Sequence, residues 1–149
     1  MTEFHEALRR WAKGLYPLEA GVELLIRGCG GRFANPGQPW VQRGDDPGWW
    51  WIDAEQMTED NYAALSGGET RLLRIAASLL GGPPVDLSGN LAGLDRDHIQ
   101  FVLAAIAHAS GSHEQTGPPV PHPQGRYVGR DGVRMSVNRL GSLYPWPDR

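Results

Sequence analysis

The sequence predicts a mainly α-helical fold: a core of four or five helices packed orthogonally, with one or two small β-hairpins and an extended C-terminal tail. Three observations indicate this fold class. Apolar residues recur at helical spacing before residue 111, short β-prone runs flank turn sequences, and six of the twelve prolines lie after that residue. The 149 residues suffice for one domain with a single core. We therefore expect a helical domain over residues 1–111, with an inserted tryptophan-rich hairpin (39–52), and an extension over residues 112–149.

The N-terminal segment predicts a helical hairpin. Large apolar side chains recur about one turn apart in a first helix that begins after Thr2, a candidate N-cap, and ends near Gly14. Pro17 then stands where the first turn of a helix accepts proline, and a second apolar stripe runs to Arg27. The short connection favours antiparallel packing of the two helices. The apolar positions are Phe4, Leu8, Trp11 and Leu15 in the first helix and Leu18, Val22, Leu25 and Ile26 in the second.

A hairpin rich in tryptophan follows a glycine-rich loop. Trp40–Arg43 and Trp49–Ile52 are β-prone runs on either side of an Asp-Asp-Pro-Gly turn. Because consecutive strand residues point to opposite faces, some of these rings must face outward. Either the core or the C-terminal tail covers them, or they contact a protein partner, since tryptophan is enriched at binding hot spots. The candidate partner-binding rings are Trp40, Trp49, Trp50 and Trp51.

Capping residues predict the remaining helices. Asp53, with Gln56 three residues later, favours a third helix over Ala54–Ala64. Ser66 and Glu69 form a clearer capping box, and the helix after them ends at a Gly-Gly-Pro-Pro run. A short turn begins at Asp86, and Asp95 caps a last helix that reaches Gly111. In that last helix the residues expected to face the core are Ile99, Val102, Leu103, Ile106 and Ala107.

The tail differs in composition from the helical domain. Residues 112–149 contain five arginines and three acidic residues, a net charge of +2, which leaves −5 on residues 1–111 because the whole chain carries −3. Asp131-Gly132 lies between two β-prone runs and predicts a hairpin. Such a segment cannot form its own core, so we expect it to be ordered by docking on the acidic domain or on a second chain. The residues expected to dock are Tyr127, Val128, Val133, Met135, Val137, Leu140, Leu143 and Trp146.

Composition excludes several classes of protein. The pI of 5.9 and the net charge of −3 give no overall attraction to nucleic acid or to an anionic membrane. A single cysteine cannot form an intrachain disulfide, and no apolar run approaches the length of a transmembrane helix. We therefore expect a cytoplasmic protein with no membrane association.

A segment around Ser66 resembles part of an ATP-binding-cassette domain. Leu65-Ser66-Gly67-Gly68-Glu69, the helix after it, and Ala92–Asp95 are similar to the signature motif, the following helix and the D-loop of that family. The resemblance implies that amides at this helix start contact a phosphate group. However, the chain has no GxxxxGK[ST] motif, and Val85–Asn90 lacks the acidic end of a magnesium-binding strand. Helix capping alone also explains the motif. The candidate phosphate-binding residues are Ser66, Gly67, Gly68 and Arg71.

Residues 10–111 resemble a group of small helical actinobacterial proteins of unknown function. The shared pattern comprises Lys-Gly-Leu-Tyr-Pro-x-Glu-Ala at Lys13–Ala20, a Ser-Gly-Glu-capped Leu-Arg-x-Ala-Ala-Ser-Leu helix at Ser66–Leu79, and Pro-Val-Asp-Leu with Gly-Leu-Asp at Pro84–Asp95. The resemblance implies a cytosolic helical protein and carries no catalytic residue.

No pattern of catalytic or metal-binding residues stands out, so we predict no enzymatic activity, no cofactor and no bound metal. His108 and His113, with Glu114 as a possible carboxylate, lack the spacing of a recognised metal motif. Asp95, Asp97 and His98 lie within one turn at a helix start, where the helix dipole alone favours carboxylates. Cys29 lies among glycines after a helix end, where nothing lowers a thiol pKa.

The sequence therefore favours a non-enzymatic interaction module, an adaptor or a small subunit, that binds a protein partner or forms a homo-oligomer. One alternative is a nucleotide- or phosphate-responsive protein that uses the helix start at Ser66. A second is nucleic-acid binding through the tail, which the overall charge disfavours. The residues predicted to contact a partner are the four tryptophans above together with Arg126, Tyr127, Arg130, Arg134 and Trp146.

Overall fold

The computed structural model describes residues 3–148, in which helices predominate and two small antiparallel sheets are added. The mainly helical fold class is confirmed in this form. The predicted cap at Thr2 lies outside the described residues. Within them, no helix has the length and apolar character needed to cross a membrane. The helices are α1 (Glu3–Ala12), α2 (Tyr16–Arg27), α3 (Gly67–Leu79), α4 (Leu87–Leu91) and α5 (Arg96–Ala109).

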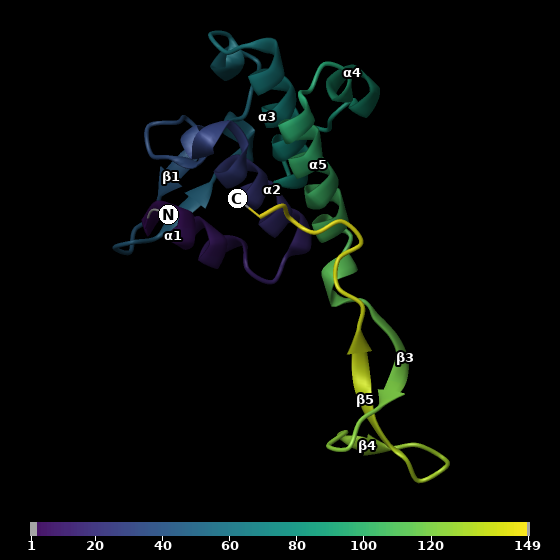
Figure 1. Cartoon of the computed structure of the whole chain (residues 1–149). Helices are drawn as coiled ribbons and strands as arrows, with labels where there is room; N and C mark the ends of the chain where they lie inside the picture. Colours follow the sequence, from purple (N-terminus) through teal and green to yellow (C-terminus); the bar gives the residue numbers. More distant parts are fainter. Residues whose placement is uncertain (1–2, 149) are drawn as a thin grey trace.

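Helix α2 lies at the centre of the body and packs against α1, α3 and α5 (Figure 1). Its apolar residues Val22, Leu24 and Leu25 are fully buried. Gly21 permits the close approach of α3, because a Cβ atom at this position would lie 2.5 Å from Cγ of Leu80. The predicted pairing of the first two helices is confirmed, but Leu15 lies between them and is 60% exposed.

The last helix buries only part of the predicted stripe. Val102 and Ala105 of α5 are buried, whereas Leu103 and Ile106 are 40% and 46% exposed. Small alanine side chains let α5 lie close to α2, so the narrower stripe makes the core contact and the larger residues are left outside. Helix α5 is therefore apolar on two sides, and one of them is uncovered.

The tryptophan-rich hairpin forms as predicted. Strand β1 (Val41–Arg43) pairs antiparallel with β2 (Trp50–Ile52), and Gln42 lies opposite Trp51. The predicted helix over 54–64 is wrong: two 3₁₀ turns, Ala54–Gln56 and Asp60–Tyr62, take its place. Met57 and Tyr62 are both buried, and a continuous helix would direct side chains five positions apart about 140° away from each other.

The C-terminal extension forms a three-stranded sheet that projects from the helical body (Figure 1). The predicted hairpin around Asp131-Gly132 is confirmed as β4 and β5, while β3 was not predicted. Residues 140–148 then return to the body, where Trp146 packs against the core. The prediction that the whole tail docks on its own helical domain is therefore wrong, because the sheet projects away from the body. The strands are β3 (Thr116–Pro121), β4 (Tyr127–Val128) and β5 (Arg134–Arg139), in the order β3-β5-β4.

Candidate functional site

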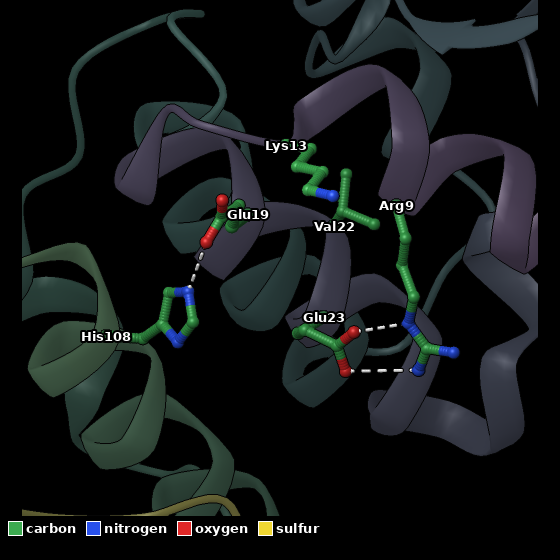
Figure 2. A pocket seen from close by; sticks show the side chains of 6 residues that line it. All are labelled: Arg9, Lys13, Glu19, Val22, Glu23 and His108. Atoms are coloured by element: carbon green, nitrogen blue, oxygen red, sulfur yellow. Dashed lines mark hydrogen bonds and ion pairs between the residues drawn. The ribbon is translucent and has the colours of Figure 1, made fainter. Parts of the chain in front are cut away.

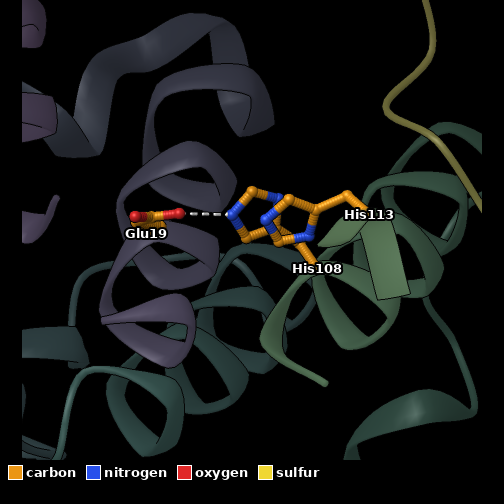
Figure 3. Close-up of side chains that lie close together, drawn as sticks. All are labelled: Glu19, His108 and His113. Atoms are coloured by element: carbon orange, nitrogen blue, oxygen red, sulfur yellow. Dashed lines mark hydrogen bonds and ion pairs between the residues drawn. The ribbon is translucent and has the colours of Figure 1, made fainter. Parts of the chain in front are cut away.

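One side-chain cluster joins three segments that are distant in the sequence: Glu19 of α2, His108 near the end of α5, and His113 on the 3₁₀ turn Ser112–Glu114. One candidate ligand atom from each residue lies within 4.8 Å of the other two. His108 Nε2 lies 2.7 Å from Glu19 Oε1, and the two imidazole rings stack with centroids 3.9 Å apart (Figure 3). The carboxylate beside the histidines is therefore Glu19 and not Glu114, which pairs with Arg139.

The cluster is partly buried and holds a charged carboxylate. Burial raises the pKa of Glu19, but the hydrogen bonds from His108 and from the Gly14 N–H outweigh it, so the pKa lies below its usual range. The edge of the Tyr16 ring meets the His113 ring at 4.9 Å. Nδ1 of His113 is buried and has no hydrogen-bond partner. A buried nitrogen without a hydrogen bond lowers the stability of the fold, because its lost hydration is not replaced. A ligand that binds His113 could therefore compensate for this loss.

A pocket of about 260 Å³ opens beside this cluster (Figure 2). Glu19 and His108 lie on one side of it, and the Arg9–Glu23 ion pair lies on the other. The pocket is large enough for several water molecules. Its lining is completed by Lys13 and Val22.

The projecting sheet, which we call the arm (residues 115–141), exposes apolar side chains on both faces. Tyr127 and Met135 are opposite each other across β4 and β5, so they share a face, and Val137 lies two residues further along that face. Val120 and Val128 lie on the other face. All but the half-buried Met135 are 39% to 57% exposed.

The predicted partner-binding arginines and Tyr127 lie on the arm. Arg126 and Arg130 are exposed, and Arg134 donates to the Gly125 carbonyl at 3.1 Å. Trp146 lies apart from them, on the body, under the guanidinium of Arg27 at 5.1 Å. These residues therefore do not form one continuous surface, and Trp146 is occupied within its own chain.

Three of the four predicted tryptophan contacts are covered to different degrees by the body. Trp40 is fully buried and donates to the Phe33 carbonyl at 2.9 Å, so it is a core residue and not a partner contact. Trp50 packs edge-on against Phe4 of α1 at 5.1 Å, and Trp51 is half-buried. Trp49, which is 47% exposed, remains open to solvent.

The candidate phosphate site at Ser66 is a complete capping box. The Ser66 hydroxyl accepts from the Glu69 N–H at 3.2 Å, and the Glu69 carboxylate accepts from the Ser66 N–H at 3.0 Å. Glu69 also pairs with Arg32. Arg71 lies beside Gly67. Because a carboxylate of the chain itself occupies the helix start, these residues are explained by capping.

The structure also brings Cys29 next to His98 and Asp95, a contact across 69 positions that the sequence does not indicate. Cys29 Sγ lies 3.6 Å from His98 Nε2, and His98 Nδ1 lies 3.0 Å from Asp95 Oδ2. This is the order of a thiol triad. However, burial and then the Glu69 carboxylate raise the pKa of the thiol, and His98 Nε2 also accepts a hydrogen bond from the Cys29 N–H at 3.3 Å. The arrangement favours a neutral, unreactive thiol.

Comparisons with protein-family models, with curated proteins and with solved structures find no match to this chain.

Proposed function

We propose that this chain is a non-enzymatic protein-interaction module that self-associates through its arm. The arm itself carries the proposal, because it is a three-stranded sheet that projects from the body with apolar side chains exposed on both faces. The apolar residues of this sheet gain stability from burial only when another layer covers them, and within residues 3–148 of the single chain nothing does. A second protein chain would provide that layer.

The occupant that best fits the arm is a second copy of the same chain. The arm carries four arginines and one aspartate, whereas residues 1–111 carry a net charge of −5, so the two parts attract each other. The body also leaves Leu103 and Ile106 exposed one turn apart on α5, which supplies an apolar acceptor. Since every copy has both parts, two copies can exchange arms around a twofold axis.

The contact should be made by the face of the arm that carries Tyr127, Met135 and Val137, and not by its edges. One edge strand, β3, includes Pro118, Pro119 and Pro121, which cannot donate backbone hydrogen bonds. The other edge strand, β4, has only two residues. Both features disfavour addition of a further strand.

The test is the molecular mass of the full chain in solution, measured by light scattering. We expect twice the 16.3 kDa of one chain, and a monomer when Val137→Asp places a charge on the face of the arm that carries Tyr127 and Met135. Asn138→Asp is the matched control, because it adds the same charge on the opposite face of β5 and should leave the dimer intact. Ile106→Asp on α5 should also give a monomer. A wild-type chain that is monomeric at every soluble concentration would contradict the proposal.

A further inference from the structure

We propose that Glu19, His108 and His113 form a binding site for a divalent transition-metal ion, and that Zn²⁺ is the ion it binds. Two imidazoles and one carboxylate are a ligand set that Zn²⁺ accepts in proteins. Their candidate ligand atoms already lie within 4.8 Å of one another. The three residues come from α2, α5 and the 3₁₀ turn after α5, so the fold itself, and not a local motif, brings them together.

The state of His113 provides a second, independent observation. Its Nδ1 atom is buried without a hydrogen-bond partner. Stacking on His108 and the edge contact with Tyr16 hold the ring, and neither contact fixes which nitrogen carries the proton. A metal ion would bind one ring nitrogen and fix the proton on the other.

Metal binding requires the cluster to rearrange. It breaks the 3.5 Å hydrogen bond from the Trp146 Nε1–H to His108 Nδ1, because an imidazole that binds a metal through Nε2 carries its proton on Nδ1. A coordinated ion lies in the plane of each imidazole, whereas the two rings are now almost parallel, at 13° to each other. With metal–ligand bonds of about 2.0–2.1 Å, ligand atoms around a tetrahedral ion are roughly 3.3 Å apart, so the 2.7 Å contact between His108 and Glu19 must open. His113 lies on a single 3₁₀ turn after Gly111 (φ 79°), whereas Glu19 and His108 lie on the packed helices α2 and α5.

The three protein ligands leave one coordination position open. The pocket of about 260 Å³ beside Glu19 and His108 provides room for water as the fourth ligand. Lys13 lines the same pocket (Figure 2), and its positive charge favours a hydroxide or another anion in that position.

The bound ion would connect the base of the arm to the body. His113 precedes the arm by two residues, whereas Glu19 belongs to the central helix. Coordination would therefore hold the first residues of the arm against α2 and α5. The site does not depend on self-association, because all three ligands come from one chain.

Calorimetric titration of Zn²⁺ into the full chain, without a histidine tag, tests the proposal. We expect one ion per chain, and affinity at least about a hundredfold weaker in Glu19→Gln and in His113→Gln, because each removes a direct ligand. His122→Gln is the matched control, since His122 is exposed on the arm, and it should bind as the wild type does. Val137→Asp should also retain the site, which separates this test from that of self-association.

Absorption of Co²⁺ substituted into the wild-type chain provides a measurement that needs no variant. Intense visible bands of tetrahedral Co²⁺ are expected at one equivalent, and added Zn²⁺ should remove them. Absence of Zn²⁺ binding by the wild-type chain, or equal affinity in the wild type and both ligand variants, would overturn the proposal.

Discussion

At the residue scale, Glu23 is a partly buried carboxylate that ties α1 to α2. It accepts from Arg9 of α1, and from Nε of Arg27 at 2.8 Å. Burial raises the pKa of Glu23, but the hydrogen bonds from Arg9 and then from Arg27 outweigh it, so the pKa lies below its usual range. A carboxyl whose pKa is lower in the folded state stabilises the fold above its unfolded pKa.

The stabilisation by Glu23 should therefore be lost as the pH falls through the lowered pKa. We expect Glu23→Gln to reduce the free energy of unfolding by about 1–3 kcal/mol at pH 7. The free energy of unfolding should also fall less between neutral and acid pH in this variant than in the wild type. Urea denaturation at neutral and at acid pH measures both effects. Glu55→Gln on an exposed turn is the control, and an equal loss from both variants would refute the assignment.

Cys29 provides a second prediction at this scale. Because its pKa is raised by burial and by the Glu69 carboxylate, the folded chain should react slowly with iodoacetamide at neutral pH. The midpoint of the rate against pH should lie above about 8.5, the value for a free thiol. Reaction of the chain unfolded in urea is the reference. Faster reaction in the folded state would show that His98 activates the thiol.

The sequence predicts some of these residue contacts and not others. Ser66 and Asp95 act on backbone amides three residues away, so their spacing alone reveals the caps. Glu19 and His108 are 89 positions apart, and the packing of α5 on α2 is what joins them. No spacing rule covers such a pair. A sequence-based search near His113 therefore selects its neighbour Glu114.

At the scale of single elements, α3 depends on its capping box. Ser66→Ala removes the acceptor for the Glu69 N–H and should reduce the free energy of unfolding by about 1 kcal/mol. Ser78→Ala, on the same helix but outside the cap, should have a smaller effect. Chemical denaturation measures both. Equal effects would mean that the box contributes little.

Helix α5 shows where sequence pattern alone is insufficient. The predicted core residues of α5 combine Val102, which is buried, with Leu103 and Ile106, which are exposed. The large side chains of Leu103 and Ile106 shift the predicted stripe toward one side. Helix α2 packs instead on the side of Val102 and Ala105, because alanine allows the closer approach. The choice is made by the partner helix, which the local pattern does not include.

At the scale of the whole molecule, the arm is separable from the body. The Leu140 N–H donates to the Gln115 carbonyl at 3.1 Å, so the two ends of the arm lie side by side. Replacing residues 117–138 by a short glycine-serine linker should therefore leave the thermal midpoint of the body close to that of the monomeric Val137→Asp chain. The same variant should be monomeric in light scattering. A midpoint well below that of the Val137→Asp chain would show that the arm supports the body within one chain.

The C-terminal segment beyond the arm should behave in the opposite way, because it is docked. The Leu143 N–H donates to the Ser112 hydroxyl at 2.7 Å, and Arg27 Nη1 donates to the Pro147 carbonyl at 3.1 Å. Trp146 buries part of its ring against the core beneath the Arg27 guanidinium. Burial of part of an aromatic ring and a cation–π contact together contribute about 1–3 kcal/mol.

Trp146→Ala should therefore lower the stability of the body by about that amount, although it lies three residues from the end of the chain. Tyr144→Ala is the matched control, since this neighbouring aromatic residue is 40% exposed and should have little effect. Denaturation of both variants in the arm-deleted chain removes any contribution from self-association. If both variants are as stable as the arm-deleted chain without them, Trp146 does not hold the C-terminal segment on the body. If only Trp146→Ala is destabilised, the tail consists of a docked end and a free arm.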